Sequence, residues 1–118
     1  MTRPARKTDE EDVWQLAIAS DDLWEGEMVG VRVDDTDVLL VRLGEDEVHA
    51  YADRCPHAGA RLSEGMLCGT TLRCSAHHWD FDARSGEGIN PRKCTLARYP
   101  VQIVDGTVMV QLRVRDPR

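Results

Sequence analysis

The sequence predicts an all-β fold, and three observations lead to this prediction. Short apolar or alternating segments recur along the chain, and residues typical of turns separate them. No segment keeps the 3.6-residue period of a helix for more than two turns. The dipeptide Asp105-Gly106, between two valine-rich segments, is typical of a β-hairpin turn. Together these features predict a scaffold of short antiparallel strands.

The N-terminal part begins with polar residues, and the strands follow them. Residues 1–12 lack apolar periodicity, so we expect a flexible tail. The first strand is expected within residues 13–18. Residues 20–24 are expected to form a capped helical turn that Gly26 closes. Alternating valines predict the next strand at 29–33.

The remaining scaffold strands are predicted from apolar runs bounded by turns. The turns are expected at 34–37 and 44–46, and the strands at 38–41, 48–51, 101–104 and 108–114. We expect the first and last strands to pair across the segment between them.

The middle of the chain has a different character. Residues 53–94 contain all four cysteines and three of the four histidines. Only two short strands are predicted there, at 71–73 and 79–81. The sequence therefore predicts an irregular, ligand-bearing insertion in a β scaffold.

Length and charge limit the classes of function. A chain of 118 residues with 31% charged and 42% hydrophobic residues fits one globular domain. No apolar run approaches the roughly 18 residues of a membrane span, and no signal peptide precedes the domain, so we expect a cytoplasmic protein. A net charge of −6 argues against nucleic-acid binding. The charge is uneven, with −9 over residues 13–53 and +3 over residues 54–99, which would orient a partner protein.

Two short motifs carry the chemistry. Cys55-Pro56-His57 and Cys74-Ser75-Ala76-His77 each offer one thiolate and one imidazole, and sixteen residues separate His57 from Cys74. Such a set suits a structural zinc ion, or a [2Fe–2S] cluster with both thiolates on one iron and both imidazoles on the other. Common zinc modules pair like ligands in each loop. The mixed pairs favour the two-iron cluster.

These motifs resemble the Rieske family, and the similarity runs from about Trp14 to Val110. Four segments carry the resemblance to the cluster loops and their flanks: Arg54–Ala60, Leu62–Gly65, Cys74–Phe81 and Gly86–Pro91. The resemblance implies a Rieske fold, with an antiparallel β-sandwich-like base domain and a small cluster-binding subdomain. The domain would cover 13–115, and the subdomain about 53–94.

The resemblance also implies the ligand set and the exit for electrons. Cys55, His57, Cys74 and His77 would hold one [2Fe–2S] cluster per chain. The histidine-bound iron would lie nearest the solvent. Partners would then approach through a tip near Pro56, Ala58, Trp79 and Pro91.

A narrower resemblance is to the ferredoxins of toluene and alkene monooxygenases. It rests on 24–28, 88–91, Cys94 and 96–101. It implies a monomeric electron carrier, not an enzyme, between an NADH-dependent flavin reductase and a diiron hydroxylase acting on aromatic hydrocarbons or alkenes. The alternatives are a ferredoxin of a ring-hydroxylating dioxygenase, the small subunit of a nitrite reductase, and a zinc-stabilised binding module.

Some positions depart from the respiratory members of the family. Ala60 and Ala76 stand where those proteins have a disulfide, and Trp79 replaces a hydroxyl residue near the bridging sulfurs. Fewer hydrogen bonds to sulfur predict a potential toward the low end of the Rieske range. His78 replaces a glycine, and we expect it to be a surface or packing residue.

The other distinctive side chains are expected to be structural. Cys68 and Cys94 are predicted to be buried as small apolar residues. His49 is predicted to be structural, and Trp79 to exclude water from the metal centre. A further group is predicted to be core: Trp14, Trp24, Tyr51 and Phe81.

Overall fold

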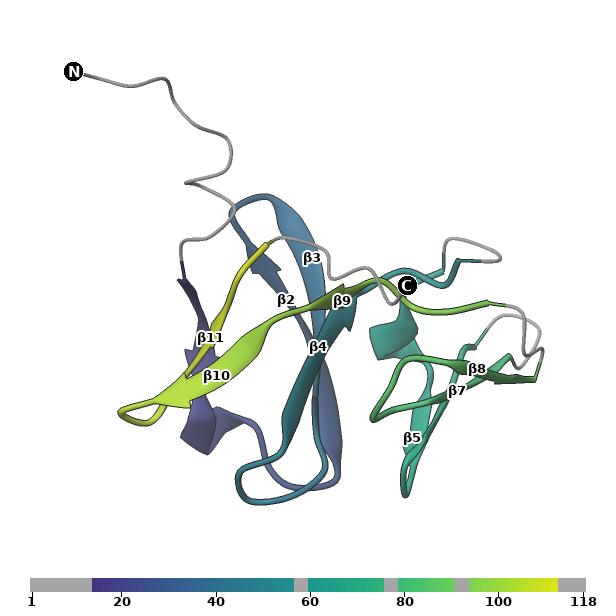
Figure 1. Ribbon diagram of the computed structural model, residues 1–118, viewed down its shortest axis with the longest axis horizontal. Helices are drawn as coiled ribbons and strands as arrows, with labels where there is room; N and C mark the ends of the chain where they lie inside the picture. The colour runs from purple at the N-terminus through teal and green to yellow at the C-terminus, as the bar shows by residue number, and fades with distance from the viewer. Residues whose placement is uncertain (1–13, 57–59, 76–78, 91–93, 113–118) are drawn as a thin grey trace.

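The computed structural model describes residues 14–56, 60–75, 79–90 and 94–112 (Figure 1). These residues form eleven β-strands and two short 3₁₀ helices, in three antiparallel sheets. The predicted all-β class is confirmed. No helix in the described part of the chain is long and apolar enough to cross a membrane. The tail predicted at 1–12 lies outside the described residues.

The first sheet has the order β1-β11-β10. Its strands are β1 (Gln15–Ala19), β10 (Val101–Val104) and β11 (Thr107–Val110). Asp105 and Gly106 join β10 to β11 with φ values of 51° and 76°, as a tight hairpin turn requires. β1 pairs with β11, so the predicted pairing of the first and last strands is confirmed. The last strand ends at Val110, short of the predicted 114.

The second sheet has the order β2-β3-β4-β9. Its strands are β2 (Glu27–Val33), β3 (Thr36–Arg42), β4 (Val48–Ala52) and β9 (Arg98–Tyr99). The turn between β2 and β3 consists of Asp34 and Asp35 alone, both with positive φ. The turn predicted at 34–37 was therefore too long, because Thr36 and Asp37 pair with β2.

The third sheet contains four strands where the sequence predicted two. In order they are β5 (Met66–Cys68), β6 (Thr71–Arg73), β7 (Asp80–Asp82) and β8 (Gly88–Asn90). The strand predicted at residues 71–73 is confirmed as β6. The strand predicted at 79–81 is β7, which begins one residue later. β6 and β7 each place one apolar residue between two polar ones, whereas β5 (Met66–Cys68) shows no alternation and β8 (Gly88–Asn90) begins with a glycine, so β5 and β8 were missed.

Two 3₁₀ helices complete the fold. η1 (Ser20–Asp22) is the helical turn predicted at 20–24, but it has no side-chain cap, since Ser20 lies inside it. η2 (Leu62–Glu64) leads into β5. It was not predicted as a helix.

Strand β3 separates two hydrophobic cores. Val38 and Leu40 face the base core, which lies between the first and second sheets. Leu39 and Val41 face the loop core, which lies between the second and third sheets. A strand covered on both faces needs apolar residues at every position, which explains the continuous run at 38–41. The loop core consists of Leu39, Val41, Tyr51, Cys55, Leu62, Leu72, Cys74, Phe81, Ala83 and Leu96.

An ion pair fixes the third sheet to the second outside the loop core. Arg84, in the turn after β7, places two nitrogens 2.7 Å and 3.1 Å from the carboxylate oxygens of Glu47, just before β4. His49 Nε2 lies 2.9 Å from the same carboxylate. The guanidinium of Arg84 and then His49 lower the pKa of Glu47 to about 2. The carboxylate therefore stays charged at neutral pH.

Candidate metal centre

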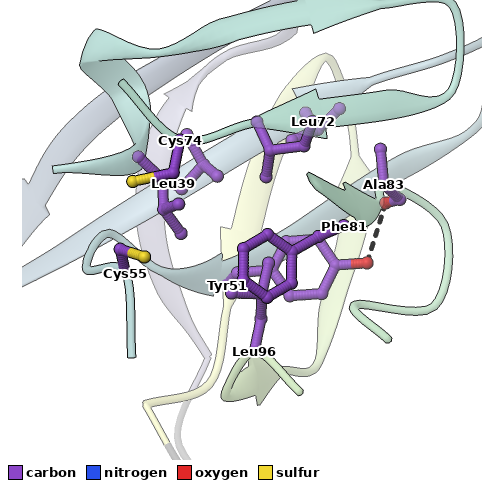
Figure 2. Packing of buried hydrophobic residues seen from close by; sticks show 10 residues of the cluster. Leu39, Tyr51, Cys55, Leu72, Cys74, Phe81, Ala83 and Leu96 are labelled. Atoms are coloured by element: carbon purple, nitrogen blue, oxygen red, sulfur yellow. Dashed lines mark hydrogen bonds between the residues drawn. The ribbon is translucent and has the colours of Figure 1, made fainter. Parts of the chain in front are cut away.

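Two buried cysteines each begin a loop that faces the loop core. Cys55 follows β4 and is 1% exposed, whereas Cys74 follows β6 directly and is fully buried. Figure 2 shows both side chains on the same side of the loop core, next to Leu39. The fold thus brings together two thiols that are far apart in the sequence.

The two loops are closed by equivalent backbone hydrogen bonds. The N–H of Cys55 donates to the carbonyl oxygen of Ala60 at 2.7 Å. The N–H of Cys74 donates to the carbonyl oxygen of Trp79 at 2.8 Å. Each bond joins residues five positions apart, so each cysteine stands at the root of a loop of the same size. Such a pair of loops can present matched ligands to one small group.

A glycine holds the two loops against each other. Gly65 follows η2, and a Cβ placed on it would lie 2.0 Å from the carbonyl oxygen of Arg73 and 3.3 Å from Cα of Cys74. Only glycine permits so close an approach of two backbones. The exit of the first loop therefore packs directly on the strand that carries the second cysteine.

A buried carboxylate joins the two ends of the first loop. Asp53 is 4% exposed and accepts two hydrogen bonds from Ser63, one from the backbone N–H and one from the hydroxyl, both of 2.7 Å. Gly30 on β2 leaves the space for this pair, since a Cβ there would lie 2.5 Å from Asp53 Oδ2. Asp53, Ser63 and Gly65 were not predicted as site residues. The available signals were the two-residue distance of Asp53 from Cys55 and, for Ser63 and Gly65, their place in the segment Leu62–Gly65 that carries the family resemblance.

The second loop has its own polar anchor. Arg73 Nε lies 2.8 Å from Asp80 Oδ1, across the paired strands β6 and β7. This hydrogen bond raises the pKa of Arg73 above its ordinary value. The ion pair therefore holds together the two strands that lead into and out of the second loop.

The surroundings of the cysteines are apolar. Tyr51 and Phe81 are fully buried in the loop core, as predicted, and burial raises the pKa of the Tyr51 hydroxyl above its ordinary range. Ala60, Trp79 and Cys94 are partly buried and pack against the same core. The packing of Trp79 agrees with its predicted part in excluding water, and that part stays a prediction.

Two predictions about individual side chains are wrong. Cys68 is exposed, because it ends β5 at the tip of the hairpin with β6. Trp24 is 69% exposed, because its indole lies against the outside of η1, where its Nε1–H donates to the carbonyl oxygen of Asp21. Trp14 is only partly buried. His49 has the predicted structural setting, because its ring stacks on that of Tyr51 with 6.5 Å between the ring centroids.

Of the four predicted ligands, the structure describes two. Cys55 and Cys74 lie together in the loop core. His57 and His77 lie outside the described residues, as do His78, Ala76 and two positions of the predicted tip, Ala58 and Pro91. Buried thiols at the roots of two facing loops fit a metal centre bound by soft sulfur ligands.

Comparison with known proteins gives the class of this protein. The model of the Rieske [2Fe–2S] domain matches residues 13–100. The ferredoxin component of the alkene monooxygenase system of Xanthobacter autotrophicus is 38% identical over 112 residues, which covers 93% of this chain and 91% of that protein. The ferredoxin component of the naphthalene 1,2-dioxygenase system of Pseudomonas putida is 34% identical over 100 residues, which covers 84% of this chain and 95% of that protein.

Two solved structures of ferredoxins from oxygenase systems are similar to this chain. A chain from the complex of reduced oxygenase and oxidized ferredoxin in carbazole 1,9a-dioxygenase has a TM-score of 0.79 at 28% identity and covers 88% of this chain and 97% of its own. The ferredoxin of carbazole 1,9a-dioxygenase from Nocardioides aromaticivorans has a TM-score of 0.73 at 27% identity and covers 81% of this chain and 95% of its own.

The chain belongs to the Rieske [2Fe–2S] family. Within the family it is a ferredoxin, an electron-transfer component of multicomponent oxygenases rather than an enzyme in itself. Its cofactor is a Rieske-type [2Fe–2S] cluster, with which the buried cysteine pair agrees. This excludes the zinc-stabilised binding module considered above.

Proposed function

We propose that this ferredoxin carries electrons from an NADH-dependent flavin reductase to the diiron hydroxylase of a monooxygenase that acts on aromatic hydrocarbons or alkenes. It would do so as a monomer in the cytoplasm. The single observation that carries the electron-transfer site is the pair of buried thiols, Cys55 and Cys74, at the roots of two loops closed in the same way.

The proposed ligands are Cys55 and Cys74 on one iron and His57 and His77 on the other. A [2Fe–2S] cluster bound in this way takes up and releases one electron. Cys55 and Cys74 would hold it as thiolates within the apolar loop core, where little water reaches them. The described cysteines and the sequence of the two loops support this assignment.

The proposed docking surface is the tip formed by the two loops. Pro56 is exposed beside the buried Cys55. A short, rigid side chain there would let a partner approach closely, which favours electron transfer. Together with the predicted tip residues outside the described ranges, Pro56 would meet both the reductase and the hydroxylase.

The 38% identity with the alkene monooxygenase ferredoxin over 93% of this chain favours a monooxygenase partner. A second candidate function is service to a ring-hydroxylating dioxygenase. The 34% identity with the naphthalene dioxygenase ferredoxin and the structural similarity to the carbazole dioxygenase ferredoxin favour it.

Electron paramagnetic resonance of the dithionite-reduced protein tests the site first. A rhombic signal with an average g below that of plant-type ferredoxins is expected. A colourless protein that contains zinc and gives no signal would refute the proposal.

Reconstituted turnover then tests the partner. A diiron hydroxylase and a ring-hydroxylating dioxygenase are each supplied with NADH, a flavin reductase and this ferredoxin. We expect faster product formation by the hydroxylase. Turnover by the dioxygenase alone would establish the second candidate instead.

A further inference from the structure

Asp53 is a buried carboxylate with no cationic partner among the described residues. Arg54 and Arg61 line the same shallow pocket, together with the carboxylates of Asp35 and Asp37. Arg61 is drawn to Asp37 instead, with a nitrogen 3.3 Å from Oδ1. Within the described ranges, Ser63 alone donates hydrogen bonds to the carboxylate of Asp53, and no ion pair neutralises it.

The hydrogen bonds do not by themselves require a charge. Both oxygens of Asp53 accept, as an ionised carboxylate does. An asparagine could accept from the N–H of Ser63 with its carbonyl and donate to the hydroxyl with its amide. The substitution Asp53→Asn would therefore remove the charge while both hydrogen bonds to Ser63 can still form.

The charge lies close to the metal centre. Asp53 is two residues before Cys55, and two residues span at most about 7 Å between Cα atoms. At a separation of roughly 10 Å and an effective dielectric constant of about 20, one unit charge changes the equilibrium constant for adding a second unit charge, such as one electron, by roughly tenfold. Burial limits screening by salt.

We propose that the buried charge of Asp53 lowers the reduction potential of the cluster. This inference rests on the proposed ligand set. With two ferric ions, two sulfides, two thiolates and two neutral imidazoles, the oxidised centre is neutral, and one added electron makes it −1. Asp53 repels that added charge and favours the oxidised form. It is thus a tuning residue that would make the ferredoxin a stronger donor to its oxygenase.

The test is the midpoint potential of Asp53→Asn in the cluster-containing protein at neutral pH, measured by a titration followed by visible absorption and paramagnetic resonance. The ratio of reduced to oxidised protein at a fixed potential should rise roughly tenfold, and the rise should persist at high salt. An unchanged potential, with the cluster retained, overturns the inference.

Two matched variants separate charge from geometry. Ser63→Ala keeps the charge and removes the hydroxyl that offsets it, so the potential should fall or stay constant. Asp35→Asn removes an exposed charge beside the same pocket, so its smaller effect should vanish at high salt. If Asp53→Asn fails to hold the cluster, Ser63→Ala decides, because a rise in its potential would mean that loosening of the loop, not charge, sets the potential.

The paramagnetic resonance signal of the unmodified protein distinguishes failure of the proposed electron-transfer function from failure of the inference about Asp53. Loss of the proposed function would appear as no Rieske signal in the unmodified protein. Failure of the charge inference would appear as an unchanged potential beside a normal Rieske signal in Asp53→Asn.

Discussion

The hydroxyl of Tyr51 donates a 2.8 Å hydrogen bond to the carbonyl oxygen of Ala83. Tyr51 belongs to β4, and Ala83 lies just after β7, so the bond joins the second sheet to the third inside the loop core (Figure 2). Both residues are fully buried. Gly86 makes room for the ring, since a Cβ on it would lie 2.8 Å from Tyr51 Cε1. The relative position of the two sheets, and hence of Cys55 and Cys74, depends on this contact.

Removing the hydroxyl should destabilise the fold. Tyr51→Phe leaves the buried carbonyl of Ala83 without its donor, which costs about 1–3 kcal/mol. The free energy of unfolding, measured with denaturant, checks this. Tyr99→Phe is the control, because the Tyr99 hydroxyl makes no hydrogen bond within the described ranges. Equal losses in the two variants would contradict the importance of the bond.

Glu47 should contribute to stability at moderately acid pH. Its pKa of about 2 in the folded protein lies below the ordinary value near 4.3, because it accepts hydrogen bonds from Arg84 and His49. A lowered pKa means that its contribution is present above about pH 4.3 and is lost as the pH falls through about 2.

An acid unfolding titration by circular dichroism checks this contribution. Glu47→Gln should be less stable than the unmodified protein near pH 5, and the difference should shrink toward pH 2. Glu45→Gln, on the same turn but without such an ion pair in the described chain, should show no such trend. A difference that grows as the pH falls would show that the sign is wrong.

Most of the scaffold could be predicted from the sequence because its strands are long enough to show a pattern. The run at 38–41 and the turn at Asp105-Gly106 are local signals, and both have the predicted structure. The third sheet was only partly predicted, because its three-residue strands are specified by their neighbours. Trp24 and Cys68 were misplaced since composition alone does not say which side of a turn faces solvent.

The class of cofactor could be predicted from the sequence, but the contacts that position the two loops could not. The cysteine and histidine motifs indicated the class of cofactor, which the family confirms, and the set of four ligands stays a prediction. The pairing of Asp53 with Ser63, and the contact of Gly65 with Arg73, depend on how η2 packs against β2 and β6. Such contacts between segments leave no periodic signal in the chain.

Adding one methyl group at Gly65 should disturb the metal centre. In Gly65→Ala the Cβ would meet the carbonyl oxygen of Arg73 at 2.0 Å, so the backbone before Cys74 must move. Overpacking of this kind costs about 1–3 kcal/mol or more. The free energy of unfolding and the iron bound per chain should both fall. Gly44→Ala is the control, because its Cβ would lie at an ordinary 3.6 Å from Glu47 Cβ. Unchanged iron content in Gly65→Ala would show that the two loops do not need this close contact.

Replacing either predicted histidine ligand with cysteine should change the electronic character of the centre. In His57→Cys or His77→Cys a thiolate replaces a neutral imidazole, so the oxidised centre gains one negative charge and resists a further electron. The potential should fall sharply, or the cluster should be lost. The potential and the paramagnetic resonance signal are measured in both variants. His78→Ala is the matched control in the second loop and should keep both properties. An unchanged potential with an intact cluster in both cysteine variants would remove His57 and His77 from the ligand set.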